Sequence, residues 1–96
     1  MNKKDEYVEK LKAQLDAWNA EVSKWEVKAK EATADAHVEY EKQLEAFRRQ
    51  RDQAMEQMRQ VQAAAGDAWL DLVRSADDAW AKAREAFEKA SSRFRK

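Results

Sequence analysis

The single histidine is the residue of this chain with the widest chemical range. His37 has Asp35, Glu39 and Glu41 within four positions of it, and an imidazole beside carboxylates can hold a divalent metal ion. A carboxylate-bridged di-metal centre in a helical bundle requires paired Glu-x-x-His motifs, but position 34 is Ala and the chain has no second histidine. The sequence therefore predicts an exposed or interfacial histidine, no metal site and no cofactor.

Nucleophilic catalysis finds no support in the residue types either. The serines Ser23, Ser75, Ser91 and Ser92 share one histidine, and the chain contains no cysteine. An oxyanion hole or a phosphate cradle built from a glycine-rich turn is also absent, because the chain has a single glycine, Gly66. We predict that the protein is not an enzyme.

Aromatic and basic side chains together could bind nucleic acid or lipid. The chain has four Trp, three Phe and two Tyr, but its nineteen basic residues are balanced by nineteen acidic ones. The densest basic cluster, Arg48, Arg49, Arg51 and Arg59, is interrupted by Asp52 and Glu56, so nucleic-acid binding is not expected. Residues 67 to 96 form an amphipathic pattern with a basic end, which suits a membrane surface. A peripheral lipid-binding protein is the alternative function.

The rings belong to three apolar runs whose members are spaced mainly by three and four residues. The first run is Val8, Leu11, Leu15, Trp18, Val22, Trp25, Ala29, Ala32 and Ala36. The second run is Leu44, Phe47, Arg51, Ala54, Met58, Val61 and Ala65. The third run is Trp69, Leu72, Ala76, Trp80, Ala83, Phe87, Ala90 and Phe94. This spacing is typical of buried seams in coiled coils and helical bundles.

The composition predicts an all-α protein with one helical domain over residues 1–96. Proline is absent, and good helix formers dominate. Gly66 followed by Asp67 is the pattern of a helix C-terminus followed by an N-cap, so we expect a turn at 66–67 and a second helix over about 68–95.

The sequence is compatible with either one helix or two over residues 4–65. A hairpin near residues 32–37 would divide the chain into three similar segments, with Thr33 or Asp35 as a cap. That segment has no Gly, Pro or Asn, and three of its six residues are Ala. We therefore expect one helix over about 4–65, roughly 60 residues and about 90 Å long.

Such a helix leaves half of its seam uncovered, because the shorter antiparallel helix reaches only the other half. We therefore expect an antiparallel homodimer with its two-fold axis near residue 34. The resulting layers would be Trp25 with Leu44 and Phe87, and Trp18 with Arg51 and Trp80. A monomeric three-helix hairpin would give the same layers within one chain. The residues expected in the core and interface are Val8, Leu11, Leu15, Trp18, Val22, Trp25, Ala29, Ala32, Leu44, Arg51, Trp69, Trp80 and Phe87.

Arg51 is the one charged residue at a seam position of the second run, and it has two interpretations. Its stem could pack while the guanidinium reaches water. Alternatively, the guanidinium could lie between Trp18 and Trp80 as a cation–π clamp that fixes helix register.

Four segments together resemble a family of small bacterial coiled-coil proteins labelled as stress-response proteins. They are DEYVEKLKAQLDAWNAE at 5–21, GDAW at 66–69, DAW at 78–80 and FEKASSRF at 87–94. The resemblance implies a cytoplasmic helical protein without catalytic residues and with no established molecular activity. It assigns no role to His37 or to the arginine cluster.

The sequence thus predicts a non-enzymatic protein that self-associates and serves as a structural or interaction module, with a possible link to stress implied by the resemblance. No stretch approaches the roughly 18 apolar residues that span a membrane, so a soluble cytoplasmic protein is expected.

Overall fold

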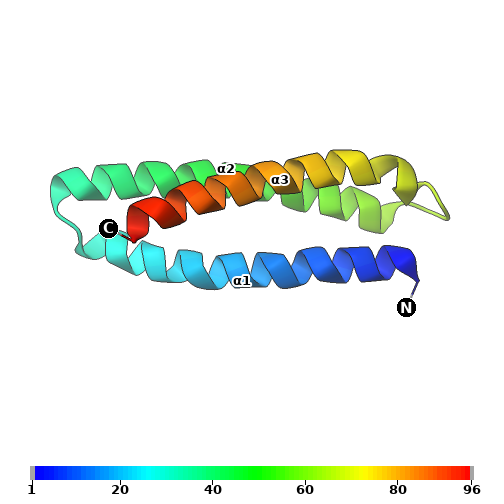
Figure 1. The fold of residues 1–96 in the computed structure, drawn as a ribbon, viewed down its shortest axis with the longest axis horizontal. Helices are drawn as coiled ribbons and strands as arrows, with labels where there is room; N and C mark the ends of the chain where they lie inside the picture. The colour runs from blue at the N-terminus through cyan, green and yellow to red at the C-terminus, as the bar shows by residue number, and fades with distance from the viewer. Residues whose placement is uncertain (1, 96) are drawn as a thin grey trace.

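Three helices, each antiparallel to the next along the chain, make up most of the part of the chain that the structure, a computed structural model, describes, namely residues 2–95. They are α1 (Lys3–Glu31), α2 (Ala34–Ala63) and α3 (Trp69–Phe94), packed into an elongated bundle of 52 × 20 × 17 Å (Figure 1). The predicted all-α class and bundle packing are confirmed. Residues 1 and 96 of the expected domain lie outside the described range.

The expected continuous helix over residues 4–65 is wrong. The chain reverses at Ala32 and Thr33, which both have an extended backbone. Ala32 has φ −77° and ψ 159°, and Thr33 has φ −61° and ψ 163°. Ala32 is the C-cap of α1 and Thr33 the N-cap of α2. The hairpin interpretation with Thr33 as a capping position describes the chain, although the Thr33 side chain makes no capping hydrogen bond.

Burial of the first seam explains why the chain reverses despite its good helix formers. Folding α1 back buries seven of its residues within the same chain, namely Val8, Leu11, Leu15, Trp18, Val22, Trp25 and Ala29. A large apolar side chain gains about 1.5–3 kcal/mol on burial, whereas a backbone hydrogen bond contributes about 0.5–1.5 kcal/mol. Breaking one helical turn costs a few such bonds, so burial wins. Lys28 and Lys30 in the last turn of α1, and Asp35 in the first turn of α2, also suit the dipoles of two separate helices.

The second reversal is confirmed near Gly66, with different details at the helix ends. Gly66 has φ +57°, a left-handed conformation that glycine adopts without strain. The preceding α2 ends at Ala63 with Ala64 as its C-cap, and α3 begins at Trp69 with Ala68 as its N-cap. Asp67 is not the N-cap; its backbone carbonyl accepts a hydrogen bond from Leu70 N at 3.0 Å.

The core contains both small alanine side chains and large aromatic ones. Helices α2 and α3 pack most extensively. Ala54 of α2 and Ala76 and Ala83 of α3 are fully buried. Helix α1 lies to one side of this pair (Figure 1) and meets α3 mainly through the rings of Trp18 and Trp25.

The folded-back α1 removes the physical reason for expecting a dimer. The apolar seam that a single long helix would leave bare is buried inside this chain, with Trp18 and Trp25 each 6% exposed. A second chain is therefore not needed to complete the core. Within residues 2–95, no helix has an apolar stretch of the length needed to cross a bilayer.

Candidate interaction surface

The interior of the bundle is built from stacked rings. Trp18 lies 5.5 Å from Trp80 and 5.8 Å from both Phe47 and Phe87, measured between ring centroids. Trp25 continues the stack, with centroids 5.0 Å from Phe87 and 5.1 Å from Phe94. Among the described residues no polar or charged residue is buried. The interior of the described residues is therefore an apolar, ring-rich core.

Arg51 does not lie between two tryptophans, so of its two interpretations the cation–π clamp is wrong. Trp18 and Trp80 stack directly on each other with an interplanar angle of 26°. The guanidinium of Arg51 instead donates to Asn19 Oδ1 at 3.1 Å and lies 3.4 Å from Asp52 Oδ1. The stem packs while the charged end reaches the surface, as the other interpretation held.

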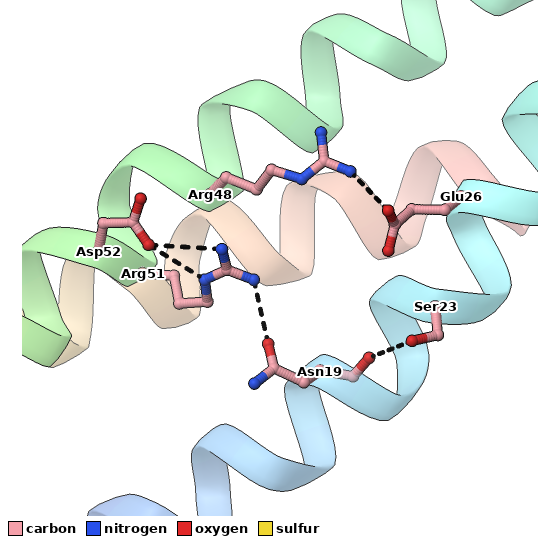
Figure 2. A network of polar contacts seen from close by, with 6 residues as sticks. All are labelled: Asn19, Ser23, Glu26, Arg48, Arg51 and Asp52. Carbon is pink, nitrogen blue, oxygen red and sulfur yellow. Dashed lines mark hydrogen bonds and ion pairs between the residues drawn. The ribbon is translucent and has the colours of Figure 1, made fainter.

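Arg51 belongs to a polar network that joins α1 to α2, shown in Figure 2. Arg48 Nη2 donates to Glu26 Oε2 at 3.0 Å, one turn of α2 away from the Arg51–Asn19 contact. The Ser23 hydroxyl donates to the Asn19 carbonyl at 3.1 Å. Four of the six members are exposed, so the network is a set of surface contacts between α1 and α2 that adds little to stability.

His37 links the end of α1 to the start of α2. Its Nδ1 lies 2.8 Å from the Ala29 carbonyl oxygen, close enough for an Nδ1–H to donate to it. The side chain is half-buried beside the turn between α1 and α2. In residues 2–95 no three of the His, Asp and Glu side chains come together in a group that could hold a metal ion.

The opposite end of the bundle carries contacts that the sequence did not reveal. Lys4 Nζ donates to the carbonyls of Gln62 at 3.3 Å and Ala64 at 3.0 Å, so it caps the C-terminus of α2. The Tyr7 hydroxyl donates to Asp77 Oδ1, and the Tyr7 ring lies 6.0 Å from Trp69. Burial, and then the hydrogen bond and charge of Asp77, raise the pKa of Tyr7 above its usual range.

The structure brings most of the predicted core residues together inside one chain. Those that are buried are Val8, Leu11, Leu15, Trp18, Val22, Trp25, Ala29, Leu44 and Trp80. Ala32, Arg51, Trp69 and Phe87 are half-buried. Tyr7 was missed because it stands one position outside the seam, although its place beside Val8 put a ring at the edge of the core.

A groove runs along the outer junction of α2 and α3. Its volume is about 290 Å³, and its polar lining is Gln43, Arg49 and Gln50 from α2 with Lys82, Glu85 and Lys89 from α3. Two alanines, Ala46 and Ala86, also line it. Three cations stand against one carboxylate, and of the cations Arg49 is paired with Glu45 at 3.4 Å. The groove therefore has an excess of positive charge, and one small alanine side chain from each helix forms part of its lining.

Comparison with known proteins gives no relative for this chain. No protein-family model, no curated protein and no solved structure matches it. The resemblance to small bacterial coiled-coil proteins therefore stays a prediction from the sequence.

Proposed function

We propose that this protein is a non-enzymatic helical module with a structural or interaction role, which acts by binding other proteins through its outer surface. The observation that carries the proposal is the division of residue types in residues 2–95. The interior is apolar, while the charged and amide side chains are half-buried or exposed. A role in the cytoplasm under stress, implied by the family resemblance, belongs to the same proposal.

The groove between α2 and α3 is the part of the surface best suited to a partner. Ala46 and Ala86 leave room for side chains of an incoming helix, and Lys82 and Lys89 can pair with its carboxylates. Helix-in-groove docking of this kind is a common mode of recognition, and complementary charge sets its specificity and association rate. We propose an amphipathic helix with acidic flanks as the class of ligand.

Cross-linking and affinity capture in the native cell, with paired variants, test this function. A Lys82→Glu and Lys89→Glu double variant reverses the charge of the groove. A Lys10→Glu and Lys30→Glu double variant makes the same change on exposed positions of α1. We expect the captured partner to be lost with the first variant and kept with the second, while circular dichroism shows both folded. Recovery of the same proteins with wild type, both variants and bare resin would contradict the proposal.

Binding to a lipid surface is the second candidate, favoured by the basic second half of α3. Lys82, Arg84 and Lys89 stand there with few acidic neighbours. Of the rings that would enter a bilayer, Trp80 and Phe94 are buried and Trp69 and Phe87 are half-buried, so full insertion requires the helices to open. Tryptophan emission measured with anionic vesicles separates the candidates. The interaction proposal predicts an unchanged spectrum and no co-sedimentation, whereas a blue shift with co-sedimentation supports lipid binding.

A further inference from the structure

The two reversals of the chain differ in what enforces them. At 64–68 the turn includes Gly66 at φ +57°, a conformation that other residues adopt at a cost. At the first reversal Ala32 and Thr33 both have negative φ and need only a change in ψ to become helical. Local sequence therefore fixes the second reversal and leaves the first one free to straighten.

Backbone hydrogen bonding also favours a continuous helix through the first reversal. The Thr33 side chain makes no capping bond, and among the backbone bonds of residues 2–95 none joins the N–H of residues 34–36 to the end of α1. The present turn is held by Ala32 N to Ala29 O at 3.3 Å and by His37 Nδ1 to the same carbonyl. A continuous helix would pair the N–H of residues 34–36 with the carbonyls of residues 30–32. Three alanines among residues 32–36 support that conformation.

Straightening would pull α1 away from the surface that it covers. Trp18 and Trp25 would leave the rings of Phe47, Trp80 and Phe87, and both faces would be exposed to water. The segment that fits the vacated surface is another α1, because a second copy carries the same side chains at the same spacing. Exchange of identical elements is a low-cost route to a dimer.

We propose that two copies of this chain exchange α1 through the Ala32–Thr33 turn. In the exchanged dimer α1 and α2 form one helix, and each half consists of α1 from one copy with α2 and α3 from its partner. This inference rests on the proposed function as an interaction protein and names a second copy of the chain as one partner. The monomer and the dimer contain the same ring layers, and they differ in which chain supplies Trp18 and Trp25.

The pairing of α1 with α2 fits this exchange. The midpoint between Asn19 and Arg51 is residue 35, and the midpoint between Glu26 and Arg48 is residue 37, so both pairs are centred a few residues after the turn. Two straight antiparallel helices that cross near residue 36, in the first turn of α2, bring the same residues opposite each other, now between chains. The polar network of Figure 2 is therefore available to both forms.

An Ala34→Pro variant tests the exchange without disturbing the monomer. Residue 34 is the first residue of α2, where proline is accepted, and Thr33 before it already has the extended backbone that precedes proline. Proline there lacks the N–H and blocks a continuous helix. Thr33→Ala is the matched variant, because it favours the helix and removes no capping bond.

Light scattering after incubation near the unfolding midpoint and cooling gives the readout. We expect wild type to gain a species of twice the 11.2 kDa monomer mass as its concentration rises to about 1 mM, the range of effective concentration within a chain. Thr33→Ala should raise the dimer fraction several-fold, and Ala34→Pro should remove it. Circular dichroism confirms that each variant is helical.

Isotope-filtered NMR identifies the exchange itself. In a dimer mixed from labelled and unlabelled chains, Trp18 of one chain should show contacts to Phe47 and Trp80 of the other. Wild type and Thr33→Ala that stay at 11.2 kDa throughout would overturn the proposal. A dimer that persists in Ala34→Pro with ring contacts within each chain would also overturn it. Partner capture by Ala34→Pro is scored separately, so loss of the dimer leaves the test of the groove intact.

Discussion

Trp18 contacts rings from both of the other helices. Its neighbours are Phe47 on α2, and Trp80 and Phe87 on α3. Trp69, by contrast, is half-buried near the second turn and has Tyr7 as its ring neighbour. The two tryptophans therefore differ in how much of the bundle depends on them.

Trp18→Ala should lower the free energy of unfolding by about 3–5 kcal/mol, because it removes a large buried side chain and leaves a cavity. The matched change Trp69→Ala should cost less than half as much. Urea denaturation followed by circular dichroism measures both. Equal losses for the two variants would show that Trp18 is not a central contact.

The Tyr7–Asp77 pair predicts a dependence of stability on alkaline pH. The pKa of Tyr7 is raised by burial and by Asp77, so the folded chain holds the phenolic proton more tightly than the unfolded chain does. This contribution is fully present below the ordinary tyrosine pKa of about 10 and is lost as the pH rises above that value. Tyr7→Phe should remove it. Urea denaturation from pH 8 to about pH 11 should therefore show the wild type losing more stability than Tyr7→Phe, and a constant difference would contradict the assignment.

Arg51 shows which properties of a single residue could be predicted from the sequence and which could not. Its seam position and the half-burial of its side chain followed from the spacing, but the direction of the guanidinium depended on which groups surrounded it in space. Asn19 and Asp52 supply oxygens at the surface, and Trp18 and Trp80 stack directly on each other. Hydrogen-bond partners on another helix are not encoded in a heptad pattern.

The helices show the same limit at the scale of elements. The three apolar runs predicted the faces of α1, α2 and α3, and Gly66 predicted the second reversal because its conformation is local. The first reversal is set by tertiary burial of the α1 seam, and Ala32 and Thr33 give it only a weak local signal. A segment compatible with both a helix and a turn cannot be assigned from propensity alone.

The second turn can be tested at Gly66. A Cβ added there meets no atom within 4 Å, so Gly66→Ala should act through backbone strain alone. With φ at +57° we expect a loss of about 1–2 kcal/mol in the free energy of unfolding, measured by urea denaturation. Gly66→Asn should lose less, because asparagine tolerates this conformation better. An alanine variant as stable as the wild type would mean that the turn is not left-handed.

In residues 2–95 the molecule is a three-helix bundle with one apolar core shared by all three helices. Its apolar side chains are largely internal, and the few large exposed ones, such as Val27 and Leu70, stand on different helices. We propose that the protein acts through contacts with other chains, either at the groove of α2 and α3 or by exchange of α1. The sequence predicted the helical class and most of the core, while the groove arises from the packing of two distant segments.

Small-angle X-ray scattering of the dilute protein tests the closed bundle most directly. The bundle predicts a monomer of 11.2 kDa, a Cα radius of gyration of 15.4 Å before hydration is added, and a longest axis of 52 Å. A continuous helix over residues 4–65 would instead extend to about 90 Å. Scattering from dilute samples that reaches about 90 Å would contradict the reversal at Ala32 and Thr33, and with it the enclosed ring core.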